Sequence, residues 1–153
     1  MSTILFVCTG NIFRSMIAEH AFRARQSAGL PFTAASAGIE ANPQPMYPPV
    51  QNLLIERGID PSAHQQRKLT AELLNTAHLT IAMGHDHQAF IRDHFQKDVP
   101  LFNHVCFDTE DPIPDIWEAV PNYKNDEAAR KKYALYVADY IWEAMPVLFQ
   151  NLG

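Results

Sequence analysis

"TILFVCTGNIFRSMIAE", residues 3–19, is the stretch that decides the fold. Its first five residues, 3–7, are apolar and largely β-branched, which is typical of a strand buried in a parallel sheet. From Ser15 onward, apolar residues recur at helical spacing as far as about residue 28. A buried strand that passes through a short loop into a helix predicts a β-α unit, and Cys8 stands where the strand ends.

Strands and helices alternate along the rest of the chain. We expect strands over residues 31–36, 78–83 and 99–102, and helices over residues 50–57, 69–77 and 85–95 and from residue 126 onward. Residues 103–124 lack periodicity and contain three prolines, so they are expected to form one long loop. The alternation predicts an α/β fold, with one domain over residues 1–153 and a Rossmann-like parallel sheet of about four strands that carries helices on both faces. Ligands of such sheets bind beyond the carboxyl ends of the strands, which is where Cys8 lies.

The composition narrows the class of partner. The 153 residues include 12 Lys and Arg against 17 Asp and Glu, a net charge of -5, which argues against nucleic acid or an anionic membrane as the partner. The chain shows neither a bilayer-spanning apolar run nor a basic leader before the first strand. Its two cysteines, Cys8 and Cys106, make no disulfide framework and no CxxC metal motif. We therefore expect a reduced, cytoplasmic protein.

The loop after Cys8 has the properties of an anion cradle. A strand-to-helix loop presents unpaired backbone N–H groups at the positive end of a helix dipole. Gly10 allows close approach of the backbone to a ligand, and Asn11 tolerates left-handed geometry. The loop lacks the G-K-[ST] ending of a nucleotide P-loop, but Arg14 offers a planar fork for two phosphate oxygens. The same field would stabilise a thiolate at Cys8, so the string CTGNIFRS favours a nucleophile aimed at phosphorus over an inert buried cysteine.

Four segments together resemble the low-molecular-weight protein tyrosine phosphatase family. They are VCTGNIFRS at residues 7–15, SAG at 36–38, GIDPSAHQQRKLT at 58–70 and IAM at 81–83. The resemblance implies that Cys8 is the nucleophile, that Arg14 clamps the phosphate, and that Ser15 hydrogen-bonds the thiolate. It also implies a substrate-binding loop of Thr9, Gly10, Asn11, Ile12, Phe13 and Ser15, with Ser36 and His64 bracing Asn11. The chain departs from the family in having Phe13 where a second cysteine is common, Met16 in place of a proline, and no aromatic pair after the acid.

A cysteine–arginine loop has no proton to give to a leaving oxygen, so a carboxylic acid is expected on a neighbouring loop. The segment FDTEDPIPDIWEA, residues 107–119, offers Asp108, Asp111 and Asp115. The family places its acid in a D-P step, which favours Asp111. An apolar residue before the acid and an aromatic after it favour Asp115, with Trp117 as a wall of the pocket. Asp115 is the preferred interpretation, Asp111 the second and Asp108 the third.

Two other features carry weaker predictions. His85 and His87 lie two residues apart, which puts them on different faces of a helix, so a solvated helix start is favoured over a metal site. Cys106 is expected to be a small buried hydrophobe.

These residues predict a phosphatase that hydrolyses phosphomonoesters through a cysteinyl-phosphate intermediate, without a metal or other cofactor. The resemblance implies protein phosphotyrosine as its substrate, and a small aryl phosphate would serve in its place. One alternative is an arsenate reductase. That reaction would need an external thiol donor, because Cys106 alone is a poor supply of the further thiols that carry electrons. A second alternative is a phosphate-binding module without turnover.

Overall fold

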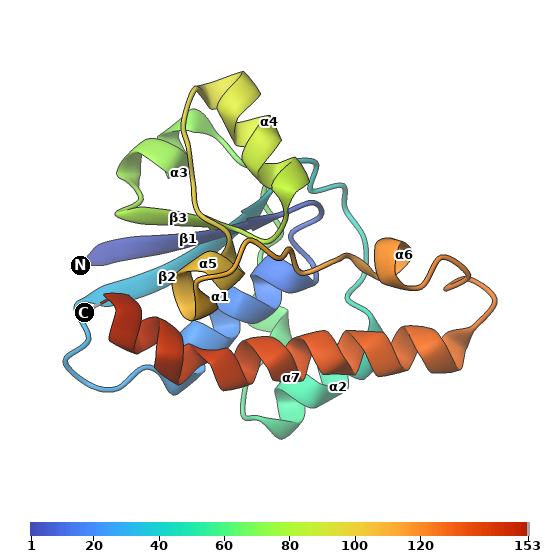
Figure 1. The fold of residues 1–153 in the computed structure, drawn as a ribbon. Coiled ribbons are helices and arrows are strands. Elements are labelled where there is room, and N and C mark those ends of the chain that lie inside the picture. The colour runs from blue at the N-terminus through green and yellow to red at the C-terminus, as the bar shows by residue number, and fades with distance from the viewer. Residues whose placement is uncertain (153) are drawn as a thin grey trace.

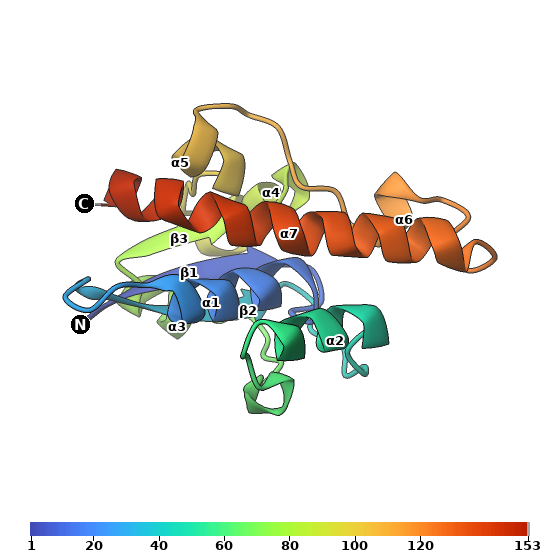
Figure 2. The same cartoon turned by 90° about the horizontal axis from the view of Figure 1, so that it is seen from below.

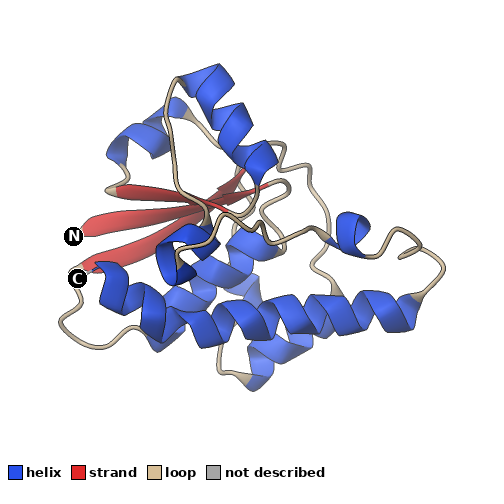
Figure 3. Ribbon diagram, in the orientation of Figure 1, coloured by secondary structure: helices blue, strands red, loops and turns tan. Residues whose placement is uncertain are grey.

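The computed structural model describes residues 1–152. Its centre is a parallel sheet of β1 (Ser2–Cys8), β2 (Phe32–Gly38) and β3 (Leu79–Ala82) in the order β2-β1-β3 (Figure 3). Cys8 pairs with Gly38 and Val7 pairs with Ala82, so the carboxyl ends of all three strands meet at one edge. The prediction of a parallel α/β fold is confirmed, and Cys8 closes the central strand.

Helices cover both faces of the sheet (Figures 1 and 2). One face carries α1 (Arg14–Arg25), α2 (Pro48–Glu56), α5 (Phe102–Phe107) and α7 (Glu127–Leu152), and the other carries α3 (Ala71–Thr76) and α4 (His85–Phe95). Alternate residues of β1 serve the two sides, as strand geometry requires. Phe6 lies in the larger core with α1 and α7, whereas Leu5 and Val7 lie in the smaller one. Burial of both faces explains why residues 3–7 read as a continuous apolar run.

The predicted fourth strand is wrong. Residues 99–102 contribute a single bridge, between Leu101 and Ala82, because the chain turns into α5 at Phe102. The predicted loop over residues 103–124 is also wrong in part, since it contains α5 and a one-turn helix, α6 (Ile116–Ala119). Helices of six and four residues are too short to produce a helical period in the sequence. A short 3₁₀ turn, Pro61–Ala63, lies within the segment that carries His64.

None of the helices within residues 1–152 combines the length and the apolar character needed to cross a membrane. The longest helix, α7, packs along α1 and α2 instead. An apolar stripe of this helix, formed by Val137, Ile141, Met145 and Leu148, is fully buried in the larger core.

Candidate active site

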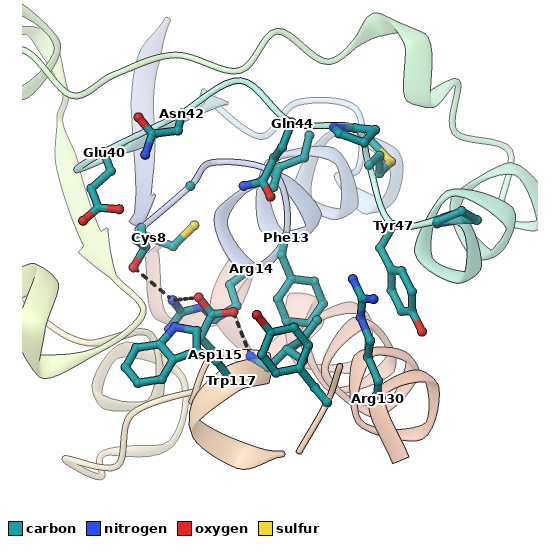
Figure 4. Close-up of a pocket in the computed structure, with 18 residues that line it drawn as sticks. Cys8, Phe13, Arg14, Glu40, Asn42, Gln44, Tyr47, Asp115, Trp117 and Arg130 are labelled. Carbon is teal, nitrogen blue, oxygen red and sulfur yellow. Dashed lines mark hydrogen bonds and ion pairs between the residues drawn. The ribbon is translucent and has the colours of Figure 1, made fainter. Parts of the chain in front are cut away.

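The loop between β1 and α1 surrounds one end of a cavity of about 460 Å³ (Figure 4). Asn11 adopts a left-handed conformation with φ of 56°, which folds the loop back on itself. Within residues 1–152, the N–H groups of residues 9–13 donate to no other main-chain group. Helix α1 then begins at Arg14 without a side-chain cap on its first turn. The loop therefore presents free donors and a helix dipole to the cavity, which is an arrangement that binds anions.

Cys8 lies at the bottom of this loop and lines the cavity. Its Sγ atom is 2.9 Å from Oγ of Ser15. The Ser15 oxygen accepts a hydrogen bond of 3.0 Å from Nδ2 of Asn11, and its own proton can be donated to the sulfur of Cys8 or to the carbonyl of Ala37 at 3.5 Å.

Asn11 is held from behind by three residues of two segments, β2 and the loop that follows residue 63. Its Nδ2 atom donates to Oγ of Ser36 at 2.8 Å, its Oδ1 accepts from the backbone N–H of Arg67 at 2.8 Å, and its carbonyl oxygen lies 2.7 Å from Nε2 of His64. The structure thus brings Ser36 and His64 to the residue that the family resemblance assigned them to brace. Gly38 completes the support, because a Cβ atom there would lie 2.5 Å from the carbonyl oxygen of Thr9.

A second layer of buried polar groups continues behind Ser36 and His64. The Ser36 hydroxyl donates to Glu19 at 2.6 Å, and Nδ1 of His64 lies 3.1 Å from Nε2 of His20. Desolvation by burial lowers the pKa of His20, with Glu19 opposing the shift, and burial likewise lowers the pKa of His64. The sequence analysis did not predict a role for Glu19 and His20. A carboxylate and an imidazole at adjacent positions of α1, on the helix face that must pack inward, were a usable signal.

Arg14 is fully buried, and its guanidinium crosses the mouth of the loop. Its Nη1 donates to the carbonyl of Ile113 at 2.8 Å, while Nη2 lies 3.2 Å from Asp115 and 3.4 Å from Oγ1 of Thr9. Its buried Nε has no hydrogen-bond partner in the part of the chain that the structure describes. The guanidinium is therefore anchored through Nη1, Nη2 is shared between Asp115 and Thr9, and only the buried Nε lacks a partner.

The three candidate acids lie in different surroundings. Asp115 lines the cavity as the N-cap of α6, with one carboxylate oxygen on Arg14 and the other accepting from the N–H of Ile116 at 2.7 Å. Asp111 is exposed in a separate surface hollow, and Asp108 is the left-handed residue that ends α5. Of the three aspartates, only Asp115 lines the same cavity as Cys8 and Arg14.

The backbone of the acid loop is fixed at two points next to Asp115. The N–H of Ile113 donates to the carbonyl of Met83 at 2.8 Å, and the Tyr133 hydroxyl donates to the carbonyl of Pro114. Burial raises the pKa of Tyr133 to about 12, so the hydroxyl remains a donor at neutral pH. These contacts bring a segment about a hundred residues distant in sequence to the loop between β1 and α1, residues 9–13, which is called the phosphate loop below.

Aromatic and charged side chains form the outer wall of the cavity (Figure 4). Trp117 projects from α6 and is 58% exposed. Tyr47 stands at the start of α2, and the guanidinium of Arg130 lies 4.1 Å from the centre of its ring. The wall is much more open to solvent than the loop beneath it.

His87 is not solvated as predicted. It is fully buried, and its Nε2 lies 2.9 Å from Oγ1 of Thr9 in the phosphate loop. Its buried Nδ1 has no hydrogen-bond partner among residues 1–152, which favours a proton on Nε2 and donation to Thr9. Burial lowers the pKa of His87 to about 4, and the nearby charge of Arg14 adds to the shift. The prediction failed because the first turn of α4 faces the sheet edge, a packing detail that residue spacing does not reveal.

Cys106 is buried in the larger core on α5, as predicted. Desolvation raises the pKa of its thiol to about 12.

Known proteins match this chain in sequence and in fold. A family model described as low molecular weight phosphotyrosine protein phosphatase matches residues 3–134. The protein-arginine-phosphatase of Bacillus subtilis (strain 168) is 38% identical over 96 residues, which are 61% of this chain and 63% of that protein. The probable low molecular weight protein-tyrosine-phosphatase EpsP of Ralstonia solanacearum is 40% identical over 86 residues, 55% of this chain and 57% of that protein. Each alignment thus spans less than two thirds of the curated relative.

The fold similarity extends further than the sequence alignments. A solved structure of the YwlE arginine phosphatase has a TM-score of 0.81 and 26% identity, and the match covers 98% of this chain and 95% of that one. That protein is a cysteine-to-serine mutant with a phosphorylated active-site serine.

Proposed function

This chain belongs to the low molecular weight phosphotyrosine protein phosphatase family, and we propose that it hydrolyses phosphorylated side chains of proteins through a cysteinyl-phosphate intermediate. The single observation that carries the proposal is the position of Arg14 in the cavity that Cys8 lines. Its buried guanidinium is anchored through Nη1 on Ile113, its Nε has no partner among residues 1–152, and Nη2 can exchange Asp115 for an oxygen of a phosphoryl group. The free N–H groups of residues 9–13 supply the remaining donors.

The reaction proceeds in two displacements at phosphorus. The thiolate of Cys8 attacks, an S–P bond forms, and the P–O bond to the leaving group breaks as Asp115 gives that oxygen its proton. Water then attacks phosphorus, the S–P bond breaks, and the carboxylate of Asp115 takes a proton from the water. Arg14 and the loop amides stabilise the equatorial oxygens in both steps. The phosphorylated active-site serine of the similar arginine phosphatase is in keeping with such a covalent route.

The contact between Arg14 and Asp115 is the resting state of this site. An incoming phosphoryl group competes for Nη2 of Arg14, so Asp115 is released from the ion pair at the moment when it must face the leaving oxygen.

An aryl phosphate, and hence phosphotyrosine, fits the outer wall best. Trp117, Tyr47 and Phe13 line the cavity with aromatic surface, against which a phenol ring can pack. Phosphoarginine is the second candidate, because one similar protein is a protein-arginine-phosphatase. Arg130 at the wall disfavours it, since a guanidinium leaving group would lie near a like charge.

The two other activities have less support. Arsenate reduction needs thiols to carry electrons, and Cys106 is buried in the core with a pKa raised to about 12. A binding module without turnover would not need Asp115 beside Arg14.

One set of assays tests the proposal. Purified protein is given an aryl phosphate, a phosphotyrosine peptide and a phosphoarginine peptide, and thiol-dependent arsenate reduction is measured in parallel. We expect hydrolysis of the first two, no turnover by Cys8→Ser, and retained binding of vanadate or phosphate by that variant. Cys106→Ser is the matched control and should keep full activity. Hydrolysis that survives in Cys8→Ser, or arsenate reduction as the dominant activity, would refute the proposal.

A further inference from the structure

Three potential metal ligands converge behind the phosphate loop, outside the catalytic cavity. One ligand atom each from Glu19, His20 and His64 lies within 4.8 Å of the others. Glu19 and His20 are on α1 and are 5% and 6% exposed, whereas His64 comes from the loop between the 3₁₀ turn Pro61–Ala63 and α3 and is half-buried. Two imidazoles and a carboxylate are the donor set of many zinc sites, and a third protein ligand leaves a fourth position for water.

The spacing of the two imidazoles suits a shared ion. Nε2 of His20 and Nδ1 of His64 are 3.1 Å apart. Two nitrogens bound tetrahedrally to Zn²⁺ at about 2.0–2.1 Å lie about 3.3 Å from each other. The Glu19 carboxylate is 4.0 Å from Nε2 of His20 and therefore needs only a small shift of its side chain. Its other oxygen can keep the hydrogen bond from Ser36.

The second nitrogen of His64 is already arranged as in a metal ligand. Its Nε2 lies 2.7 Å from the carbonyl oxygen of Asn11, and a carbonyl can only accept, so Nε2 carries the proton. This leaves a lone pair on Nδ1 that accepts a hydrogen bond of 3.1 Å from Nε2–H of His20, so a bound metal ion takes the place of that proton. Metal-bound imidazoles almost always donate their other N–H to a carbonyl or carboxylate, which is the arrangement seen here.

We propose that Glu19, His20 and His64 form a binding site for a divalent transition-metal ion, with Zn²⁺ as the best match, on the side of the phosphate loop opposite the cavity. The site goes beyond the proposed phosphatase activity, because the hydrolytic steps use no metal. A bound ion would stabilise the structure behind the β1–α1 loop. It fixes the tautomer of His64 that donates to Asn11, and it links α1 to the loop that follows η1, the 3₁₀ turn Pro61–Ala63.

Arg23 sets the strength of the site. Its Nη1 lies 3.3 Å from the Glu19 carboxylate, one turn along α1, and its side chain is half-exposed. A fixed positive charge beside the ligands weakens the binding of a cation. Arg23→Gln should therefore bind Zn²⁺ more tightly than the unchanged chain does.

The experiment measures Zn²⁺ binding to the full chain with Cys8→Ser, which removes the thiolate that would otherwise compete for the ion. Calorimetry should give one site per chain. Nitrogen-15 NMR of the histidine rings should show metal at Nε2 of His20 and Nδ1 of His64, while Nε2 of His64 keeps its proton. His20→Ala in the same background should lose at least about 10²-fold in affinity, since loss of even an outer-shell partner costs 10–100-fold.

Two controls separate this site from surface binding. His104 pairs with Glu110 at 2.7 Å on the surface, so His104→Ala is the matched control and should leave the affinity unchanged. Glu19→Gln keeps the size of the side chain and should also weaken binding if His20→Ala fails to fold. The proposal would be overturned if Zn²⁺ bound to His20→Ala and Glu19→Gln as tightly as to His104→Ala, or if Zn²⁺ shifted the ring signals of histidines other than His20 and His64. Phosphatase activity is measured separately, on His20→Ala and on the unchanged chain, both with Cys8 present. Loss of Zn²⁺ binding with hydrolysis retained refutes neither proposal, whereas absence of hydrolysis by the unchanged chain would refute the proposed function alone.

Discussion

The back and the front of the candidate site are built in opposite ways. Behind the phosphate loop, Asn11, Ser15 and Ser36 are fully buried, and every polar atom of the Asn11 side chain has a partner. In front, Trp117 is 58% exposed, and Asp115 is held by a one-turn helix. Under the proposed function, the back fixes the donors that would meet a phosphoryl group, whereas the front can move toward or away from a leaving group.

Because of this difference, substitutions in the two regions should have different effects on stability and activity. A buried polar group that loses its partner destabilises the fold, because the remaining group cannot turn to water. An exposed side chain on a short helix contributes little to the free energy of unfolding. Changes at the back should therefore lower both activity and stability, and changes at the front should lower activity or affinity alone.

Asp115→Asn tests the front most severely. If Asp115 is the proton donor, aryl phosphate hydrolysis should slow by roughly 10²–10⁴-fold, the usual contribution of general acid catalysis. The loss should shrink as the leaving phenol becomes more acidic, because a better leaving group needs less help. Phosphate binding and the midpoint of thermal unfolding should change little. A series of substituted phenyl phosphates measures the dependence.

Asp111→Asn is the matched control for that variant. Asp111 is exposed in a different hollow, and its backbone carbonyl, not its side chain, receives the hydrogen bond from Asn103. Its replacement should leave the rate within about twofold, the scale of a surface change. An exchange of the two behaviours would make Asp111 the acid.

Arg14→Lys tests the back. The ammonium keeps the charge but cannot offer two parallel donors to a phosphoryl group, so turnover should fall about 10²–10³-fold. The change also removes the bond from Nη1 to the carbonyl of Ile113, which should lower the free energy of unfolding by about 1–3 kcal/mol. Arg130→Lys, at the outer wall, should do neither. Equal effects of the two substitutions on rate and stability would erase the distinction between back and front.

The residues at the back of the candidate site could be predicted from the sequence because most of them lie close together along the chain. Cys8, Asn11, Arg14 and Ser15 lie within eight residues, and a strand, a loop and a helix dictate their relation. For the acid, the sequence favoured Asp115 over Asp111 and Asp108 but could not place it beside Cys8. That placement depends on contacts such as Tyr133 with Pro114, which only the packing of α7 creates.

His87 shows where sequence reasoning ends. Thr9 and His87 are 78 residues apart, and the rotation of α4 about its axis decides whether His87 faces the loop or the solvent. The short helices α5 and α6 were missed for a related reason, because six and four residues cannot display a period of 3.6. Long-range packing, not local propensity, fixed each of these features.

His87 also predicts a pH dependence of stability at the back. Burial beside Arg14 lowers its pKa to about 4, against about 6.5 in an unfolded chain, with Asp86 opposing the shift. Between these values the unfolded chain binds the extra proton, so the free energy of unfolding rises with pH. The contribution is present above about pH 6.5 and is lost as the pH falls toward 4, by up to roughly 3 kcal/mol.

Denaturant unfolding at several pH values checks this dependence. His87→Gln keeps a donor for Thr9 and removes the titrating ring, so its stability should fall less between pH 6.5 and 4. His85→Gln is the control, because His85 is exposed on the same helix. An unchanged profile for His87→Gln would show that His87 does not titrate in this window.

Trp117→Ala should have the smallest effect, and it defines the limit of the front. Its ring lines the cavity from a helix of four residues, with most of its surface in solvent. If it packs against a phenol ring, its loss should raise KM for aryl phosphates by about 2–10-fold, the equivalent of 0.5–1.5 kcal/mol for an aromatic pair. The value of kcat should stay within about twofold, because Trp117 touches neither phosphorus nor the leaving oxygen. Inhibition by inorganic phosphate, which has no ring, should not change, and neither should the unfolding midpoint.

Tyr136→Ala removes an aromatic ring that is 60% exposed but lies away from the cavity, so it controls for the loss of exposed apolar surface. A fall in kcat of Trp117→Ala that matches the fall in Asp115→Asn would mean that the tryptophan positions the acid, and α6 would then belong with the rigid back of the site.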